Sequence, residues 1–336
     1  MLMQKKRITL QDVADHAGVS RATASLIVRG SPKIAEKTRR KVLKSMHELG
    51  YVYDRIAANM RSQTSTTVGL IITDIANPFF TELLGGVHQA LEDAGYTVFL
   101  GTTYDSVFKQ EELLSRMLEH RVGGIILCPV SDSSDDSIEW LKKIDIPIVL
   151  AVRELEGLDC DYVGINYEVG AQMAVNHLIH RGHRRIAFLG GDSRSSAWKE
   201  RNIGFRTALK QAGLEVEESL IVESPVTREG GRSAVRKVLF QQNPPTAAFC
   251  FNDLVAHGVI LGLSDAGYKA GEDLAIVGFD NNNEAPLYNP PLTTVSSYAR
   301  LIGSQAASLL QQRMLNPEGE RQRIILQPEL IVRSSS

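Results

Sequence analysis

The chain has 336 residues, of which 43% are hydrophobic, and a formal net charge of −2. This length and composition allow a large core and two or three domains. No apolar run approaches the roughly 18 residues of a transmembrane helix, and the start MLMQKKR lacks the features of a secretory signal. Three widely spaced cysteines, Cys128, Cys160 and Cys250, fit neither a disulfide framework nor a zinc finger and favour a reducing cytoplasm.

Residues 8–28 predict two short helices around a tight turn. Thr9 suits the N-cap of the first helix because Asp12 follows three residues later, as in a capping box. Gly18 suits a left-handed turn, and Ser20 can cap the second helix. Two helices joined so closely are typical of a helix-turn-helix, whose second helix enters the DNA major groove. An ordinary helical hairpin in a small bundle is the alternative interpretation.

Charge is unevenly distributed along the chain. Residues 1–62 contain thirteen Lys and Arg against five Asp and Glu, a net charge of +8, and the rest of the chain carries −10. This asymmetry favours a nucleic-acid-binding arm on an acidic body, with a solvated charged face as the alternative. Residues 34–49 predict a third helix with Ala35 as its N-cap, and residues 54–61 a helix too short to be stable alone. The polar stretch 62–67 marks a domain boundary.

A known family shares these motifs. The pattern T-x-x-D-V-A-x-x-A-G-V-S-x-x-T-x-S runs from Thr9 to Ser25, and KTRRKV (37–42) and HELGY (47–51) follow it. This resembles the headpiece of the lactose/galactose-repressor family of bacterial transcription regulators, and the resemblance continues through the body. The string S-L with R-G soon after, and the later SSDD, resemble the maltose-regulon branch. The resemblance implies a hinge helix at 54–61 that folds on DNA, with Met60 where the family has Leu.

The resemblance also implies DNA contacts. Arg21, Ala22 and Leu26 match positions that face base edges, although many members have Arg where Leu26 stands. Thr23, Ser25 and Arg29 match phosphate contacts. The expected DNA-binding set is Thr9, Ser20, Arg21, Ala22, Thr23, Ser25, Leu26, Arg29, Arg55, Ala57 and Met60.

The body alternates apolar segments with amphipathic ones, which is typical of parallel strands covered on both faces by helices. The first series predicts strand 68–74, helix 79–94, strand 96–103, helix 108–121, strand 123–128, helix 135–143 and strand 147–151. The second predicts strand 163–166, helix 168–181, strand 185–189, helix 196–212, strand 220–223, helix 227–242, strand 247–251, helix 253–266 and strand 274–280. The fold class is α/β, with two doubly wound lobes and a cleft at the strands' carboxyl ends.

The resemblance implies a particular division of the chain. The headpiece with its hinge helix covers residues 1–62, and the effector-binding and dimerisation body covers 63–336. By resemblance to periplasmic-binding-protein folds, lobe one takes 66–164 and 295–317, and lobe two takes 165–293 and 321–333.

The expected effector site consists of side chains at strand ends that match family positions, together with Arg153 and Trp198 near the same rim. The set is Phe79, Phe80, Arg153, Trp198, Arg201, Asn252, Asp253 and Asp280, with Asn77 and Pro78 beside the first two. Arg, Asn, Asp and Phe supply the flat apolar faces and bidentate polar groups that a sugar needs. Alternatively, Asp280 is only a turn residue and Phe79 only core. Family members often have an aromatic residue where Val226 stands, which leaves the ligand open.

Other kinds of site are not predicted. The chain has no G-x-G-x-x-G after a strand, no phosphate-binding G-x-x-x-x-G-K-[ST], and no serine in nucleophile-elbow context. His177, His180 and His183 stand three apart, but His183 lies beyond the helix end, so a structural junction is favoured over a metal site. We expect no cofactor, no metal and no enzymatic activity.

The sequence therefore predicts a homodimeric transcriptional regulator, a repressor that binds a palindromic operator and works in the cytoplasm at the nucleoid. Its small effector is expected to be a sugar or sugar phosphate in the interlobe cleft, and no membrane partner is expected. Two alternatives of other classes stay open at this point: a transport-type sugar-binding protein and a cytoplasmic enzyme on the same body fold.

Overall fold

The computed structural model describes residues 8–28, 31–53, 65–133 and 135–336. The chain divides into two compact units, Met1–Thr64 and Ser65–Ser336. Each unit is described by itself below. Among the described residues, no helix has the length and apolar character that spanning a membrane requires.

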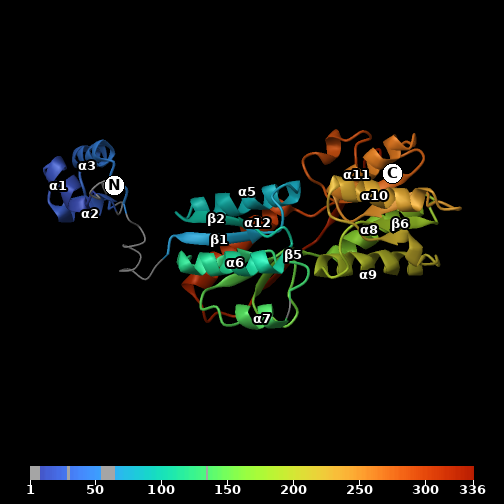
Figure 1. Cartoon of the computed structure of the whole chain (residues 1–336), viewed down its shortest axis with the longest axis horizontal. Helices are drawn as coiled ribbons and strands as arrows, with labels where there is room; N and C mark the ends of the chain where they lie inside the picture. Colours follow the sequence, from blue (N-terminus) through green and yellow to red (C-terminus); the bar gives the residue numbers. More distant parts are fainter. Residues whose placement is uncertain (1–7, 29–30, 54–64, 134) are drawn as a thin grey trace, which may run out of the picture. The chain divides into compact units, whose positions relative to one another are not determined.

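In the part of the first unit that the structure describes, the helices are α1 (Leu10–Ala17), α2 (Arg21–Val28) and α3 (Glu36–Leu49) (Figure 1). Their core consists of the buried side chains of Val13, Ala14, Ala17, Ala24, Ile27 and Val42. The capping box predicted from the sequence is confirmed, since Thr9 Oγ1 accepts from Asp12 N and the Asp12 carboxylate accepts from Thr9 N. Gly18 has φ 60°, as the turn requires, and Ser20 Oγ accepts from Thr23 N at 3.1 Å.

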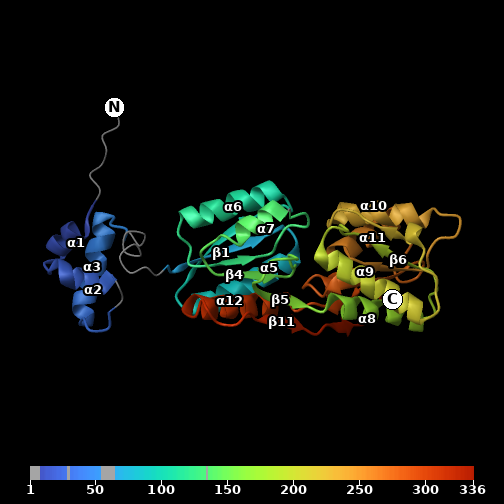
Figure 2. The same ribbon diagram turned by 90° about the horizontal axis from the view of Figure 1, so that it is seen from below.

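The first lobe of the body is built on a parallel sheet of strand order β11-β5-β4-β3-β1-β2. The strands are β1 (Thr67–Ile72), β2 (Thr97–Thr102), β3 (Ile125–Leu127), β4 (Ile148–Ala151), β5 (Asp161–Ile165) and β11 (Arg323–Leu326). Helices α5 (Pro78–Glu92) and α12 (Ala299–Leu315) cover one face, and α6 (Val107–Glu119) and α7 (Asp135–Leu141) the other (Figures 1 and 2).

The second lobe repeats this plan with strand order β12-β10-β9-β8-β6-β7. The strands are β6 (Ile186–Leu189), β7 (Ile221–Val222), β8 (Ala247–Cys250), β9 (Ala275–Asp280), β10 (Thr293–Ser296) and β12 (Glu329–Ile331). Only the β10–β12 pair is antiparallel in this sheet. Helices α8 (Tyr167–His180) and α9 (Ser196–Gln211) cover one face, and α10 (Arg228–Leu239) and α11 (Asp253–Asp265) the other (Figure 2). The predicted alternation of strands and helices is confirmed.

One strand, β11, lies wholly in a different sheet from the one expected, and β5 and β10 straddle the expected lobe boundaries. The strand predicted at 163–166 is β5, which pairs with β4 in the first sheet rather than opening the second. Residues 293–296 pair with β9, so the chain returns to lobe one only at α12. Residues 321–333 are shared, since β11 pairs with β5 and β12 with β10. Pairing of parallel strands is set by distant partners, which the local sequence does not encode.

Two glycines allow α5 and α12 to pack at close range. A Cβ on Gly303 would lie 2.1 Å from the carbonyl oxygen of Leu83, and one on Gly86 would lie 2.0 Å from that of Arg300. At its other end, α12 is tied to β5 because the buried Arg313 guanidinium contacts the Asp161 carboxylate at 2.7 and 2.9 Å. The helix that returns from lobe two is therefore fixed to lobe one at both ends.

Replacing Gly303 by Ala tests the close packing of α12. A new methyl group would press against backbone, which cannot rotate away, so we expect a loss of about 1–3 kcal/mol in unfolding free energy. Helix propensity alone would favour Ala by about 1 kcal/mol. Ser308→Ala, at an exposed position of the same helix, is the control and should change stability by under about 0.5 kcal/mol. Urea unfolding of both variants measures the difference, and equal stability would contradict the packing argument.

Candidate effector cleft and DNA-reading helix

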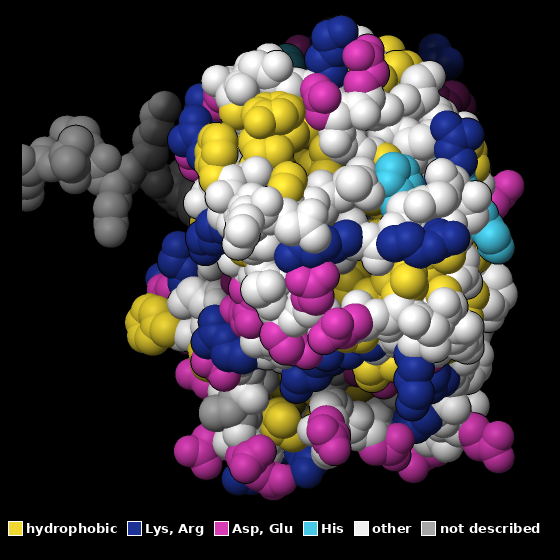
Figure 3. Space-filling model, turned by 90° about the vertical axis from the view of Figure 1, so that its right-hand side faces the viewer, with side chains coloured by type: hydrophobic (Ala, Val, Ile, Leu, Met, Phe, Trp, Pro, Cys, Tyr) yellow, Lys and Arg dark blue, Asp and Glu magenta, His cyan; other side chains and the backbone are white. Residues whose placement is uncertain are grey.

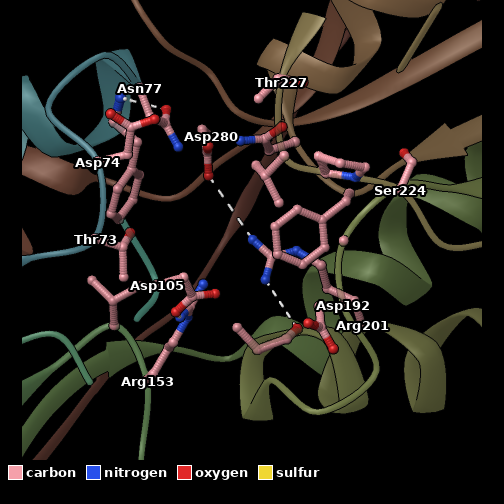
Figure 4. Close-up of a pocket in the computed structure, with 18 of the residues that line it drawn as sticks. Thr73, Asp74, Asn77, Asp105, Arg153, Asp192, Arg201, Ser224, Thr227 and Asp280 are labelled. Carbon is pink, nitrogen blue, oxygen red and sulfur yellow. Dashed lines mark hydrogen bonds and ion pairs between the residues drawn. The ribbon is translucent and has the colours of Figure 1, made fainter. Parts of the chain in front are cut away.

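The carboxyl ends of the strands of both sheets border one cavity in the body, of about 650 Å³ (Figure 4). That size suits a small organic ligand, and strand carboxyl ends are where open parallel sheets bind ligands. The polar lining comes from both lobes, including Asp74 and Asn77 from lobe one and Arg201 and Asp280 from lobe two.

Arg201, on α9, is the most enclosed cation of the cleft, with 3% of its surface exposed. Its guanidinium carbon lies 4.2 Å from the ring centroid of Tyr167, 4.5 Å from Phe251 and 4.1 Å from Phe279. Nη1 donates to the Ala197 carbonyl oxygen, Nη2 lies 3.9 Å from Asp280, and Nε has no hydrogen-bond partner among the described residues. Burial lowers the pKa of Arg201. An unpartnered buried donor is costly, so this geometry favours a ligand that accepts from it.

Asp280 ends β9 with φ 116°, a backbone conformation that is rare for residues other than glycine. Burial raises the pKa of its carboxyl to about 7, against the opposing effect of Arg201. The neighbouring Asp253 is fully buried, and burial also raises its pKa well above the ordinary value. Figure 4 shows Arg201 directed at Asp280 across the cavity. A strained carboxylate facing a buried guanidinium is the arrangement expected of a ligand clamp rather than of a simple turn.

Lobe one supplies an aromatic wall and a second guanidinium. Asn77 caps α5 by accepting from Phe79 N at 3.1 Å, and this places Phe79 and Phe80 with their rings edge to face, 5.1 Å apart. Arg153, just after β4, donates to the Asp105 carboxylate at 2.7 Å. A flat apolar face beside fixed polar groups is suited to binding a sugar ring.

The two lobes also touch at the rim of the cleft. Arg194, after β6, contacts Asp132 of lobe one at 2.7 Å. Ser196 Oγ accepts from Glu154 N at 3.1 Å, and Glu82 Oε1 accepts from Asn283 N at 3.1 Å. These contacts must change whenever the lobes rotate.

Six of the eight expected effector residues line the cavity: Phe79, Phe80, Arg153, Arg201, Asn252 and Asp280. Trp198 and Asp253 do not. Trp198 stacks on Phe188 and donates to the Gly190 carbonyl, because it is rotated by about 100° from Ala197 on a helix of 3.6 residues per turn. Asp253 accepts from Asn282 N and Thr294 Oγ1 inside lobe two. The structure thus gives both side chains partners inside lobe two, and their contact with a ligand stays a prediction.

Other residues that line the cavity also lie just after the carboxyl ends of strands. Asp74 follows β1, Asp105 follows β2, and Asp192 and Glu223 follow β6 and β7. The strand ends in the sequence were therefore the signal that could have found them. The other lining residues outside the expected set are Thr73, Asn77, Tyr104, Val152, Tyr167, Gly191, Ser193, Arg194, Ala197, Ser224, Pro225, Val226, Thr227 and Phe251.

In the headpiece, the expected DNA-reading positions lie on α2. Arg21, Ala22 and Leu26 are exposed there, and Ser25 is half-buried. The side chains of Thr9, Ser20 and Thr23 take part in helix caps. Arg29, Arg55, Ala57 and Met60 lie outside the described residues. The net charge of residues 1–62 is +8, whereas the end of the second lobe carries interspersed acidic and basic side chains (Figure 3).

The histidine series does not converge on one point. His177 Nε2 pairs with Ser336 Oγ, and His183 Nδ1 pairs with Thr246 Oγ1, each 2.9 Å away. Within the described ranges, no group of three or more His, Cys, Asp or Glu side chains is placed to hold a metal ion. The structural interpretation of these histidines is therefore preferred.

Comparison with known proteins covers both units. Residues 9–54 match the family of bacterial regulatory proteins of the lacI type, and residues 65–333 match the periplasmic binding proteins and sugar-binding domain of the LacI family. The chain is 34% identical to the HTH-type transcriptional repressor PurR of Photobacterium profundum, over 97% of this chain and 98% of the relative.

Two solved structures are similar over the same span. A complex of the transcriptional regulator CelR with cellobiose is 32% identical, with a TM-score of 0.74, covering 98% of this chain and 100% of that one. The Lac repressor dimer bound to operator and the anti-inducer ONPF is 25% identical, with a TM-score of 0.85, covering 98% and 99%.

These similarities confirm the family predicted from the sequence, while the maltose-regulon branch stays a prediction. The relatives are repressors and not enzymes, and the matched headpiece disfavours a transport protein. A DNA-binding regulator of this kind works in the cytoplasm. The chain belongs to the LacI family of DNA-binding transcriptional repressors, with an N-terminal helix-turn-helix headpiece and a ligand-binding body of two parallel-sheet lobes.

Proposed function

We propose that this repressor binds a palindromic operator at the nucleoid as a homodimer, and that a sugar or sugar phosphate in the cleft controls it. The observation that carries the proposal is the pair formed by Arg201 and Asp280, buried in the cleft, where Arg201 Nε has no hydrogen-bond partner among the residues that the structure describes. Two-fold symmetric dimers bind two half-sites, which accounts for the palindrome.

The cleft supports a sugar-like effector. The rings of Phe79 and Phe80 offer an apolar wall, and Arg201 and Asp280 offer a donor and an acceptor opposite it. The similar CelR structure is a cellobiose complex, which supports the same ligand class here.

Lobe rotation is the proposed means of control. A ligand that touches both lobes favours the closed arrangement, because it binds that state more tightly. The rim contacts of Arg194 with Asp132 and of Asn283 with Glu82 join the two lobes, so a rotation of the lobes would break or remake them. A mobility-shift titration of DNA upstream of the protein's own gene, with and without candidate sugars, tests the function. Absence of specific binding to any such DNA would contradict it.

Arg21 is the proposed base-reading residue. It is exposed on the first turn of α2, and a guanidinium can donate two hydrogen bonds to guanine. Arg21→Ala should cost about 1–3 kcal/mol on the operator and relax preference at one base pair of each half-site. Arg40→Ala, at an exposed position of α3, removes the same charge as a control and should leave base preference unchanged. Unchanged relative affinities across operator variants of Arg21→Ala would identify it as a phosphate contact.

Arg201→Ala and Asp280→Ala test the cleft. Both should fold, dimerise and retain operator binding, yet respond to effector only at concentrations at least about tenfold higher, since each leaves a buried partner unpaired. Lys199→Ala, exposed on the same helix as Arg201, is the control and should respond like the unaltered protein. Operator titration with and without effector gives the comparison. Ordinary effector sensitivity in both cleft variants would remove this cleft as the control site.

Asp280 also predicts a dependence of stability on pH. Burial raises its pKa from 3.8 to about 7, so between these values the native state holds a proton that the unfolded chain has lost. Its contribution to stability is complete below pH 3.8 and is lost as the pH rises through about 7. The Asp280→Asn variant has no carboxyl group that can ionise here. The unfolding free energy of the variant, minus that of the unaltered protein, should therefore increase as the pH rises from 5 to 8. Urea unfolding across that range measures the effect, and parallel pH profiles would contradict the prediction.

A further inference from the structure

We propose that the cleft selects an uncharged polyhydroxylated ligand and excludes phosphorylated ones, and that Asp74 and Glu223 enforce this choice. The inference rests on the proposed function and narrows its ligand class.

Each guanidinium that lines the cleft lies within ion-pair distance of a carboxylate of this chain. Arg153 pairs with Asp105 at 2.7 Å. Arg194 pairs with Asp192 at 2.6 Å and also with Asp132. Arg201 faces Asp280 at 3.9 Å. A phosphate binds best to a guanidinium that offers two parallel donors, and to gain such an edge in this cleft it would have to displace one of these carboxylates.

Two further carboxylates face the cleft without a cation. Asp74, on lobe one, accepts from Ala76 N at 2.9 Å, and Glu223, on lobe two, accepts from Ser193 N at 2.8 Å. Among the described residues, neither has a Lys or Arg nitrogen within ion-pair distance. They add two negative charges, one on each side of the cavity, to a lining in which the other charges are paired. An anion would meet repulsion from both lobes as they close.

Helix starts do not supply an alternative phosphate site. Asn77 caps α5 and Asn252 caps α11, so a backbone N–H in the first turn of each is already bonded. Helix α9 starts at Ser196 without a side-chain cap, but the Asp192 carboxylate stands in the loop before it and also lines the cavity. That carboxylate already accepts from the backbone N and the guanidinium of Arg194, and its negative charge disfavours a phosphate in the same loop.

Hydroxyl groups fit the same lining. The carboxylates of Asp74, Glu223 and Asp280 accept hydrogen bonds, which a sugar hydroxyl can donate and a phosphate dianion cannot. Arg201 Nε and Ser224 Oγ are buried polar atoms without partners among the described residues, and a hydroxyl can pair with either. A neutral polyol thus satisfies donors and acceptors together without bringing a charge into the cleft.

The test compares matched ligand pairs on the full-length protein. The pairs are glucose and glucose 6-phosphate, ribose and ribose 5-phosphate, and cellobiose and cellobiose 6-phosphate, each measured by thermal shift and by calorimetric titration. We expect stabilisation by the neutral member of at least one pair and none by its phosphate. Equal or tighter binding of a phosphorylated member would overturn the inference and leave the proposed function intact. Binding by no member would overturn the ligand class of the proposed function, and this inference with it.

The variant Asp74→Asn with Glu223→Gln isolates the two carboxylates. Both changes keep side-chain size and remove negative charge. Relative to its neutral partner, the phosphorylated member should gain affinity by about tenfold, a difference that two charges at the cavity wall can supply. Glu229→Gln removes one carboxylate at an exposed position of α10 outside the cavity lining, and as a control for charge loss elsewhere it should leave the ratio unchanged. An unchanged ratio in the double variant would show that these carboxylates do not select the ligand.

Discussion

The arrangement of the body depends on one constraint, namely that the chain passes between the lobes three times. It leaves lobe one after β5, returns after β10 to form α12, and leaves again between β11 and β12. The last passage is only Gln327 and Pro328 long, so the lobes cannot separate. They can rotate about the passages, which keep the carboxyl edges of both sheets facing one cavity. A site assembled from two lobes in this way reports their rotation, which a site within one lobe could not do.

In the proposed site, selectivity for a ligand would arise from the burial of charged groups. Arg201 is held between three aromatic rings with Nε unpartnered, and the pKa of Asp280 is raised by burial because water cannot solvate its charge. The unliganded cleft is therefore incompletely satisfied, and ligand binding can complete its hydrogen bonds. The same incompleteness penalises a ligand that lacks the matching group, because donors and acceptors would then stay buried and unpaired.

Helix bounds and helix caps could be predicted from the sequence, because they depend on a few neighbouring residues. Helix α9 was expected at 196–212 and spans Ser196–Gln211, and the capping box at Thr9 is present, because caps and amphipathic periodicity act over a few residues. Sheet membership of β11 was not predictable in the same way, since its partner β5 lies far away in sequence. Trp198 was expected in the site because it lies near the rim formed by the strand ends. Its position around the helix axis, which closeness to a strand end does not predict, directs its ring against Phe188 in the core.

Charge separates the two tasks of the chain. The N-terminal 62 residues carry +8 and the remainder −10. Positive charge attracts every phosphate near the headpiece, and that attraction does not depend on sequence, so base contacts must supply specificity. A cleft built from similar cations would attract phosphates as well, including those of metabolites unrelated to the signal. Pairing each guanidinium of the cleft with a carboxylate of the same chain keeps its hydrogen-bonding geometry and cancels its long-range attraction. The ligand site can then respond to hydroxyl arrangement while the headpiece responds to phosphate and base.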